Sequence, residues 1–458
     1  MIAAARIAAF DVLQAVSKGR ADLPTALANA RERLQDPRDR ALCAEIATGV
    51  ERHRSALDYL IATFAKRQIE RLDTEVLAVL RLSAYQLLHL TRVPAAAVVD
   101  DAVDLTKRAK KRSASGFVNA VLRSISRSRR SLPLPQRPSD PSSRAPALEY
   151  LSTTLSHPRW LVERWYERLG FDATEQWLQF NNQPAPLTLR INRLKTTADA
   201  LVARLASDDV HVTPGRFAPD ALIVDSSVAP GEGQPLQTGS WTEGWFVVQD
   251  EASQLIVTLV GPTPGTRVLD TCASPGGKTV ALAATMGNRG LLVACDLRDK
   301  RVKLLKRTVA ACDASVVRIV QADASAPLPF TTPFDLVIVD APCSGLGTLR
   351  RDPDIRWRRR EEDLPALAAA QRQMLRHAAD AVAPGGRLIY ATCSSEPEEN
   401  EEVAAAFVAN SPGFVPVDAR TIPGVPGAVV DPRGHLRTTP HLHGLEAFFG
   451  AVFERRRS

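Results

Sequence analysis

TRVLDTCASPGGKTVALAATMG, residues 266–287, has the pattern of an apolar strand, a loop of small residues and a helix. Strands and helices alternate from this point onward. Further strands are expected at 290–296, 316–323, 334–343 and 386–393, and helices at 299–312 and 363–382. This alternation predicts an α/β fold, in which helices cover both faces of a mostly parallel sheet. Ligands of such sheets bind outside the carboxyl ends of the strands, so the residues at those ends are the candidates for function.

The loop after the first strand suits close contact between a ligand and the N–H groups at a helix start. Its GGKT ending, residues 276–279, suggests a phosphate loop. That motif needs a glycine five residues before its last glycine, where this chain has Cys272. The loop also lacks the G-x-G-x-x-G pattern of dinucleotide-binding proteins, so ATP and NAD are disfavoured. An ordinary turn between strand and helix is the structural alternative.

Acidic residues close the second and third strands of this series. Asp296 ends the second strand, 26 residues after Asp270. A carboxylate there can bind both hydroxyls of a ribose, or it can cap the next helix. Asp323 follows the third strand and can accept a hydrogen bond from an adenine amino group, or can cap a turn. Together with the loop, these acids favour a nucleoside cofactor.

Cysteines follow the fourth and fifth strands, at Cys343 and Cys393. If these strands are neighbours, they lie roughly 5 Å apart, and both thiols face one ligand at the sheet edge. Buried cysteines are commonly inert core residues, but two at strand ends favour nucleophilic catalysis. Such a nucleophile needs activation by positive charge or by a proton acceptor.

An arginine-rich run, RRDPDIRWRRR at 350–360, follows the Cys343 loop. It predicts phosphate binding beside the active site, with Trp357 packing or stacking there. The alternative is a solvated, charged helix start.

The front of the chain is organised differently. Residues 1–128 have helical periodicity throughout and carry a basic cluster at 107–112. Residues 129–148 are rich in Pro, Ser and Arg and predict a linker. A small α+β domain is expected at 149–245, and the catalytic domain at 246–458.

Composition narrows the class of protein. The 458 residues are 45% hydrophobic, with a formal net charge of +7, which favours a nucleic-acid partner or reflects a GC-rich genome. No run of 18 apolar residues and no signal peptide is seen, so we expect a cytoplasmic protein without a membrane partner. The six cysteines show no CxxC spacing, and His435, His441 and His443 lack ligand partners at metal-site spacing. We expect no metal.

Three motifs together resemble the RNA (cytosine-5) methyltransferases of the Nop2/Sun type. DTCASPGGKT at 270–279 is similar to that family's first S-adenosylmethionine motif, with Ser274 in place of the usual alanine. VDAPCSG at 339–345 and ATCSSEPEENEEV at 391–403 resemble its two cysteine motifs. The tail at 437–455 resembles the family's ending, with Glu446 where aspartate is commoner.

The rest of the chain extends the resemblance. RVPAAAVVDDAVDLTKR at 92–108 and GFVNAVLR at 116–123 resemble the NusB antiterminator domain. The middle unit is similar to a small RRM-like domain. This combination resembles the ribosomal small-subunit methyltransferase B group, which implies an all-α NusB-like domain, an RRM-like domain and a Rossmann-like methyltransferase domain.

The resemblance implies methylation of carbon 5 of a cytosine in RNA, most simply 16S rRNA, through a covalent cysteine adduct. It makes Cys393 the nucleophile, Cys343 the residue that assists release and Asp340 the group that holds the cytosine. The residues implied to bind S-adenosylmethionine are Cys272, Ala273, Ser274, Pro275, Gly276, Gly277, Lys278, Asp296, Asp323 and Asp340. The implied partner is 16S rRNA, free or in an early small-subunit particle, and we expect a monomer.

Other functions are left open by the residues. A tRNA cytosine-5 methyltransferase would use the same chemistry. A DNA methyltransferase normally takes its nucleophile from the Pro-Cys motif alone, so the presence of both cysteines favours RNA. An RNA-binding or ribosome assembly factor without catalysis would not need the intact cysteine pair.

Overall fold

The computed structural model describes residues 2–225 and 243–457, which form two compact units. The first unit holds the chain up to Pro184 together with the segment Leu349–Arg359. The second holds the remaining described residues. Within the described residues, no helix is both long enough and apolar enough to cross a membrane.

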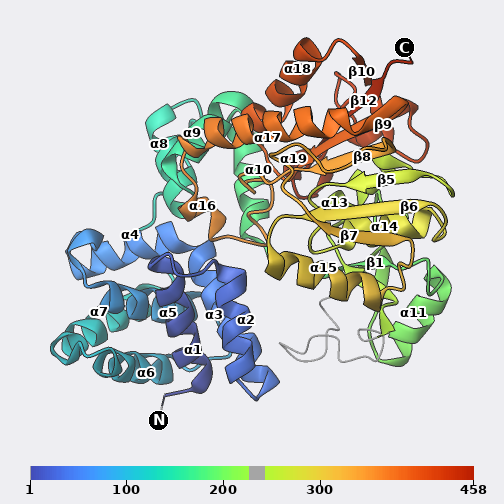
Figure 1. Ribbon diagram of the computed structural model, residues 1–458. Helices are drawn as coiled ribbons and strands as arrows, with labels where there is room; N and C mark the ends of the chain where they lie inside the picture. Colours follow the sequence, from blue (N-terminus) through green and yellow to red (C-terminus); the bar gives the residue numbers. More distant parts are fainter. Residues whose placement is uncertain (1, 226–242, 458) are drawn as a thin grey trace. The chain divides into compact units, whose positions relative to one another are not determined.

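The front of the first unit is helical, as the periodicity of residues 1–128 predicts (Figure 1). Asp22 and Asp36 cap the second and third helices with their side chains, and a proline stands in the first turn of each. Apolar side chains from all seven main helices meet in one core. These helices are α1 (Ala4–Ser17), α2 (Leu23–Arg33), α3 (Pro37–Arg52), α4 (Arg54–Ala65), α5 (Thr74–His89), α6 (Ala95–Arg108) and α7 (Ser115–Ser128).

The same unit continues through α8 (Arg144–Glu149), a π-helical turn (Tyr150–Thr154), α9 (Arg159–Leu169) and α10 (Phe171–Asn182). The Pro-, Ser- and Arg-rich segment before α8 makes specific contacts with these helices. Arg137 forms ion pairs with Asp172 and Glu175 of α10, and Thr154 Oγ1 donates to the Pro135 carbonyl. The segment is therefore anchored to these helices at Pro135 and Arg137, and its role as a linker between domains stays a prediction.

The second unit begins with a small antiparallel sheet in the order β2-β3-β1-β4, accompanied by α11 (Ala198–Ser207). The strands are β1 (Thr188–Ile191), β2 (Val212–Pro214), β3 (Ala221–Val224) and β4 (Phe246–Val248). A predicted small α+β fold is confirmed here.

A larger sheet follows, with the strand order β10-β12-β9-β8-β5-β6-β7 and β11 paired to β12. The strands from β9 to β7 are parallel, whereas β10, β11 and β12 add an antiparallel edge that the periodicity did not predict. The strands are β5 (Arg267–Asp270), β6 (Leu291–Asp296), β7 (Val317–Gln321), β8 (Phe334–Asp340), β9 (Val382–Thr392), β10 (Phe414–Val417), β11 (Leu436–Arg437) and β12 (Phe449–Arg455).

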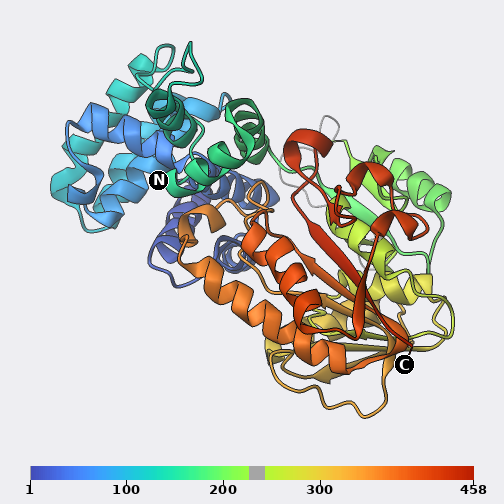
Figure 2. The same ribbon diagram turned by 90° about the horizontal axis from the view of Figure 1, so that it is seen from above.

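Helices cover both faces of this sheet, as predicted. Val268 and Ile338 point to the face covered by α13 (Glu251–Val260), α14 (Gly277–Thr285) and α15 (Asp299–Ala311). Leu269 and Val339, the next residues in the same strands, point to the face covered by α17 (Asp363–Asp380) and α18 (Glu401–Asn410). Figure 2 looks onto this second face, where α17 lies in front of the sheet. Strands buried on both sides need apolar residues at every position, which is why they are apolar without alternation.

Candidate active site

The strand order reverses at β5, which has β6 on one side and β8 on the other. The loops that follow β5 and β8 leave the sheet at its carboxyl edge on either side of this switch point. A crevice between such loops is the usual ligand site of open α/β sheets. The predicted residues from the first, fourth and fifth strands are therefore brought to one edge.

The loop after β5 is held against its neighbours by backbone contacts that leave little room for side chains. The Ala273 N–H donates to the Cys295 carbonyl at 2.8 Å. Gly276 has φ +108°, and a Cβ there would lie 3.0 Å from Leu305 Cδ1 of α15. Both the left-handed backbone and the close helix require glycine at this position. This is the physical reason for the small residues that the sequence shows.

A cavity of about 420 Å³ lies beside this loop. Lys278 and Asp340 line it together with Asp270 at the end of β5. The volume suits a small organic ligand. The other lining residues are Gly244, Phe246, Val247, Val248, Gln249, Ser253, Cys272, Ala273, Ser274, Pro275, Gly277, Thr308, Ala311 and Cys312.

Lys278 and Asp340 form an ion pair in this cavity, with Nζ 2.7 Å from Oδ2. The lysine side chain is 14% exposed and the aspartate 27%. Burial disfavours the charged ammonium, but the attraction of Asp340 outweighs it and raises the pKa of Lys278. The Cys393 sulfur also contributes to this rise, so the two groups are close enough to interact. Lys278 is therefore a positive charge that is held against Asp340 in the cavity.

The two strand-end cysteines face each other. Strands β8 and β9 are parallel neighbours, with Asp340 beside Ala391. The two loops that carry the thiols therefore leave the sheet side by side at its carboxyl edge. The Sγ atoms of Cys343 and Cys393 are 3.2 Å apart. The hydrogen bond with Cys393, and then burial, raise the pKa of Cys343 well above its usual value. Cys343 accordingly keeps its proton in the pair.

Asp296 and Asp323 are at the carboxyl edge but are outside the lining of the cavity. Asp296 is buried, accepts a hydrogen bond from the Ser274 N–H and forms an ion pair with Arg301. Asp323 accepts from both the N–H and the hydroxyl of Ser325, which lower its pKa. Both carboxylates therefore organise local structure, and their binding of a ribose and an adenine stays a prediction.

Asp270 is a functional candidate that the sequence analysis missed. It is 1% exposed, and one oxygen accepts from Thr279 Oγ1 at 2.8 Å. Within the described residues, the other oxygen, Oδ1, is buried without a hydrogen-bond partner. Burial, followed by the nearby charge of Asp340, raises the pKa of Asp270 to about 7. The signal in the sequence is an acid that closes a buried strand immediately before the small-residue loop.

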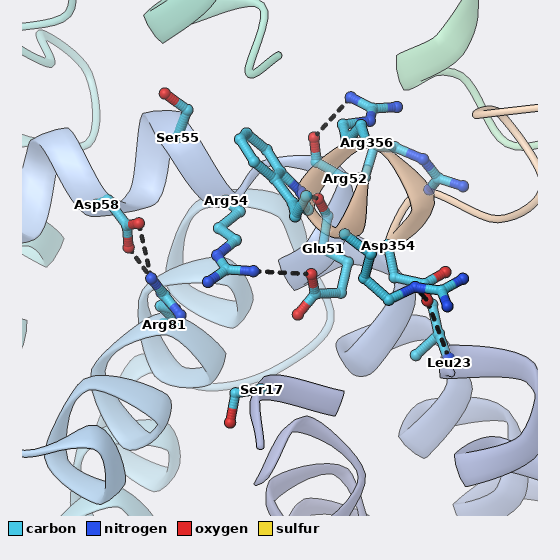
Figure 3. A network of polar contacts seen from close by, with 12 residues as sticks. Ser17, Leu23, Glu51, Arg52, Arg54, Ser55, Asp58, Arg81, Asp354 and Arg356 are labelled. Atoms are coloured by element: carbon cyan, nitrogen blue, oxygen red, sulfur yellow. Dashed lines mark hydrogen bonds and ion pairs between the residues drawn. The ribbon is translucent and has the colours of Figure 1, made fainter. Parts of the chain in front are cut away.

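The arginine run is a correction to the sequence analysis. Arg356 was expected to bind phosphate or to be solvated, but it is fully buried in the first unit. Its guanidinium donates to the carbonyls of Arg52, Ser156, Asn181 and Leu349 and to the side chain of Asn182, as Figure 3 shows for Arg52. Trp357 packs, which is one of its two expected roles: its Nε1 donates to the Glu51 carbonyl and Arg54 lies over its ring. This segment is a structural element.

The three histidines near the end of the chain have local partners. His435 lies 3.5 Å from Asp431, and His443 Nδ1 accepts from the Thr439 N–H. Within the described ranges, no group of three or more His, Cys, Asp or Glu side chains is arranged to hold a metal ion.

Family models match three parts of the chain. Residues 257–454 match the model described as 16S rRNA methyltransferase RsmB/F. Residues 3–127 match the NusB family, and residues 157–229 match a ferredoxin-like domain of RsmF/B-like methyltransferases.

Curated relatives cover most of the chain. The probable ribosomal RNA small subunit methyltransferase B of Bacillus subtilis strain 168 is 34% identical, over 90% of this chain and 89% of its own length. Ribosomal RNA small subunit methyltransferase B of Pseudomonas putida strain KT2440 is 35% identical, over 92% of each. Among solved structures, PH0851 superposes with a TM-score of 0.79 at 26% identity, over 99% of both chains. A methyltransferase homolog protein from Pyrococcus horikoshii gives a TM-score of 0.59 at 23% identity, over 68% of this chain and 99% of its own, and shows the fold alone.

Proposed function

Because the chain belongs to the RsmB/F family of 16S rRNA methyltransferases, we propose that Cys343 and Cys393 catalyse methylation of carbon 5 of a cytosine in 16S rRNA. The protein is an S-adenosylmethionine-dependent RNA methyltransferase. The observation that carries the catalytic proposal is the 3.2 Å separation of the two sulfur atoms at the carboxyl edge of the sheet.

The residues around the switch point fit S-adenosylmethionine. The cavity has a suitable volume, Gly277 and Lys278 of the small-residue loop line it, and Asp270 presents a buried oxygen that can accept a hydrogen bond. We assign the cofactor to the loop 272–278 and to Asp340, with Asp296 and Asp323 at the ends of the next two strands. When bound, S-adenosylmethionine supplies an electrophilic methyl group.

Cytosine carbon 5 is a poor nucleophile until a thiolate adds to carbon 6 and makes carbon 5 enamine-like. We assign this addition to Cys393, as the resemblance of ATCSSEPEENEEV at 391–403 to the family's second cysteine motif implies. Cys343, which keeps its proton, assists release of the product after a base has removed the proton from carbon 5. Asp340 holds the cytosine ring and its developing charge. The target cytosine must leave any stack of nucleobases to reach this edge of the sheet.

The substrate proposal rests on the family and on charge. The formal net charge of +7 and the exposed basic cluster at 107–112 suit a polyanion. We propose a cytoplasmic monomer that acts on 16S rRNA, either free or in an early small-subunit particle.

Transfer of tritiated methyl groups from S-adenosylmethionine tests the function. Naked 16S rRNA, small-subunit particles and bulk tRNA serve as parallel substrates, and bisulfite sequencing locates the modified base. We expect 5-methylcytosine at one position of 16S rRNA and none in tRNA. Label in tRNA alone would replace the rRNA assignment with the tRNA alternative. A purified, folded protein that labels none of these substrates would contradict the enzymatic proposal.

A further inference from the structure

A buried carboxylate, Glu399, lies behind the two cysteine loops. It belongs to the short 3-10 turn Pro397–Glu399 between β9 and α18, and it is fully buried. Its Oε1 accepts from the Ser344 N–H at 2.8 Å and from Gln371 Nε2 at 2.9 Å. Its Oε2 accepts from the Ser394 hydroxyl at 2.6 Å. Three buried donors therefore converge on one acidic side chain.

Two of these donors belong to residues that directly follow the cysteines. Ser344 comes after Cys343 on the β8 loop, and Ser394 comes after Cys393 on the β9 loop. The hydroxyls of the two serines are themselves 3.1 Å apart. A single carboxylate thus ties together the two loops that present the thiols.

The surroundings hold Glu399 in place. The Tyr390 hydroxyl donates to the Glu399 carbonyl, and Gln371 also donates to the Pro342 carbonyl at 3.1 Å. The loops meet a second time at Gly347, whose N–H donates to the Cys393 carbonyl at 2.9 Å. A Cβ on Gly347 would lie 2.7 Å from that carbonyl oxygen, so the approach is as close as the backbone permits. Both loops are therefore fixed to each other by buried hydrogen bonds.

We propose that Glu399 is a positioning residue, which holds Cys343 and Cys393 at the mutual distance that their reaction on one cytosine requires. The inference rests on the proposed function, in which both thiols act on the same base. Among the described residues, the Glu399 carboxylate accepts hydrogen bonds from Ser344, Gln371 and Ser394, so its influence on the thiols runs through Ser344 and Ser394. Its negative charge also contributes to the raised pKa of Cys343.

Glu399→Gln tests the proposal, with Glu402→Gln as the matched control. The amide has nearly the same shape but carries donors, so it cannot accept from all three partners at once. Glu402 lies three residues further along and is exposed. Glu399→Ala is a less useful variant, because it leaves three buried donors without an acceptor and lowers stability.

Two readouts separate positioning from general damage. The first is the rate at which an azodicarboxamide oxidant joins Cys343 to Cys393, followed by peptide mass mapping; the azo group takes up the two protons and two electrons released by the thiols. The second is kcat for methyl transfer together with KM for S-adenosylmethionine. For Glu399→Gln we expect slower disulfide formation and kcat lower by about tenfold or more, with KM within about twofold of wild type.

Each other outcome has a definite meaning. If Glu399→Gln, Glu402→Gln and wild type have the same oxidation rate as one another and the same rate of methyl transfer as one another, the proposal is overturned. A parallel loss of melting temperature, cofactor affinity and kcat would also overturn it, because Glu399 would then be structural only. If oxidation is slowed in Glu399→Gln but no protein transfers methyl groups, the positioning role stands and the proposed function fails.

Discussion

Asp270 shows how burial changes the chemistry of a carboxyl group. It is shielded from solvent at the end of β5, and its pKa is raised to about 7 by this burial and then by the charge of Asp340. A carboxyl with a raised pKa binds its proton more tightly in the folded chain than in the unfolded chain. Stability contributed by this group is therefore present at low pH and is lost as the pH rises toward the folded pKa.

Asp270→Asn should reduce the pH dependence of the free energy of unfolding. In the absence of cofactor, the wild-type free energy of unfolding should fall between about pH 4 and pH 7 relative to that of the variant, by on the order of 1 kcal/mol or more. Urea unfolding of both proteins at several pH values measures the difference, and the comparison cancels other titrating groups. Parallel curves for the two proteins would show that the Asp270 pKa is not raised.

Asp296→Ala should weaken binding of S-adenosylmethionine and leave RNA affinity nearly intact. Loss of a charge-assisted hydrogen bond to a ribose costs about 1.5–3 kcal/mol, or roughly ten- to hundred-fold in affinity. Calorimetry measures this, with Arg301→Gln as the control that removes the ion pair but keeps the carboxylate. Unchanged affinity in Asp296→Ala, or an equal loss in both variants, would mean that Asp296 only organises the loop.

At the residue scale, the sequence predicts what is local. The small-residue loop and both cysteines could be located because each motif is contiguous. Glu399 could not be singled out among the acids at 396–402, because its partners Ser344 and Gln371 are 55 and 28 residues away in the sequence. Asp270 was overlooked for a related reason, since its property arises from burial by the whole sheet.

Among the elements, Leu349–Arg359 differs most from its expected role. Six arginines in eleven residues at 350–360 predicted an exposed, phosphate-binding surface. Arg356 instead finds its acceptors on segments up to 304 residues away, and Asp354 accepts from the Leu23 N–H at the start of α2 (Figure 3). A run of charged residues indicates an exposed segment only when no hydrogen-bond acceptors surround it in the fold. Most acceptors of Arg356 are backbone carbonyls, whose positions a sequence does not reveal.

Arg356→Met should destabilise the first unit. Several buried carbonyl groups would lose their donor, and each unsatisfied group costs about 1–3 kcal/mol, so we expect a loss of ~3 kcal/mol or more. Thermal or urea unfolding measures it, with Arg360→Met, an exposed position, as the control. Equal stability of the two variants would contradict the role of Arg356 as a buried hydrogen-bonding centre.

The basic cluster at the end of α6 is the element that we expect to contact RNA. Lys107 and Lys111 are engaged with Asp104 and Asp73. The exposed charges at 108, 110 and 112 remain for phosphate groups. The triple variant R108Q/K110Q/R112Q should bind rRNA more weakly, and the slope of log affinity against log salt should fall by roughly two. An unchanged slope would show that this surface does not meet RNA.

At the scale of the whole molecule, the order of the domains could be predicted from composition and motifs, but the path of the chain could not. The chain leaves the second unit after Thr348, contributes Leu349–Arg359 to the first unit and returns at Arg360. Removal of residues 1–128 would therefore take away partners of Arg356 and Trp357 as well as the basic cluster. Point substitutions in the cluster test RNA binding without this loss, and the domain boundaries stay predictions.

The central claim is that one thiol attacks the cytosine and the other releases it, and trapping of a covalent protein–RNA adduct tests it most directly. Cys393→Ala should transfer no methyl groups and form no adduct, because no other group in the motif adds to carbon 6. In Cys343→Ala, Cys393 should still attack the cytosine and the methyl group should still be transferred to the RNA, but slow release should leave a protein–RNA adduct that survives denaturing electrophoresis. The double variant should form none. An adduct with Cys393→Ala and none with Cys343→Ala would reverse the two roles, and unchanged methylation in both would contradict the covalent mechanism.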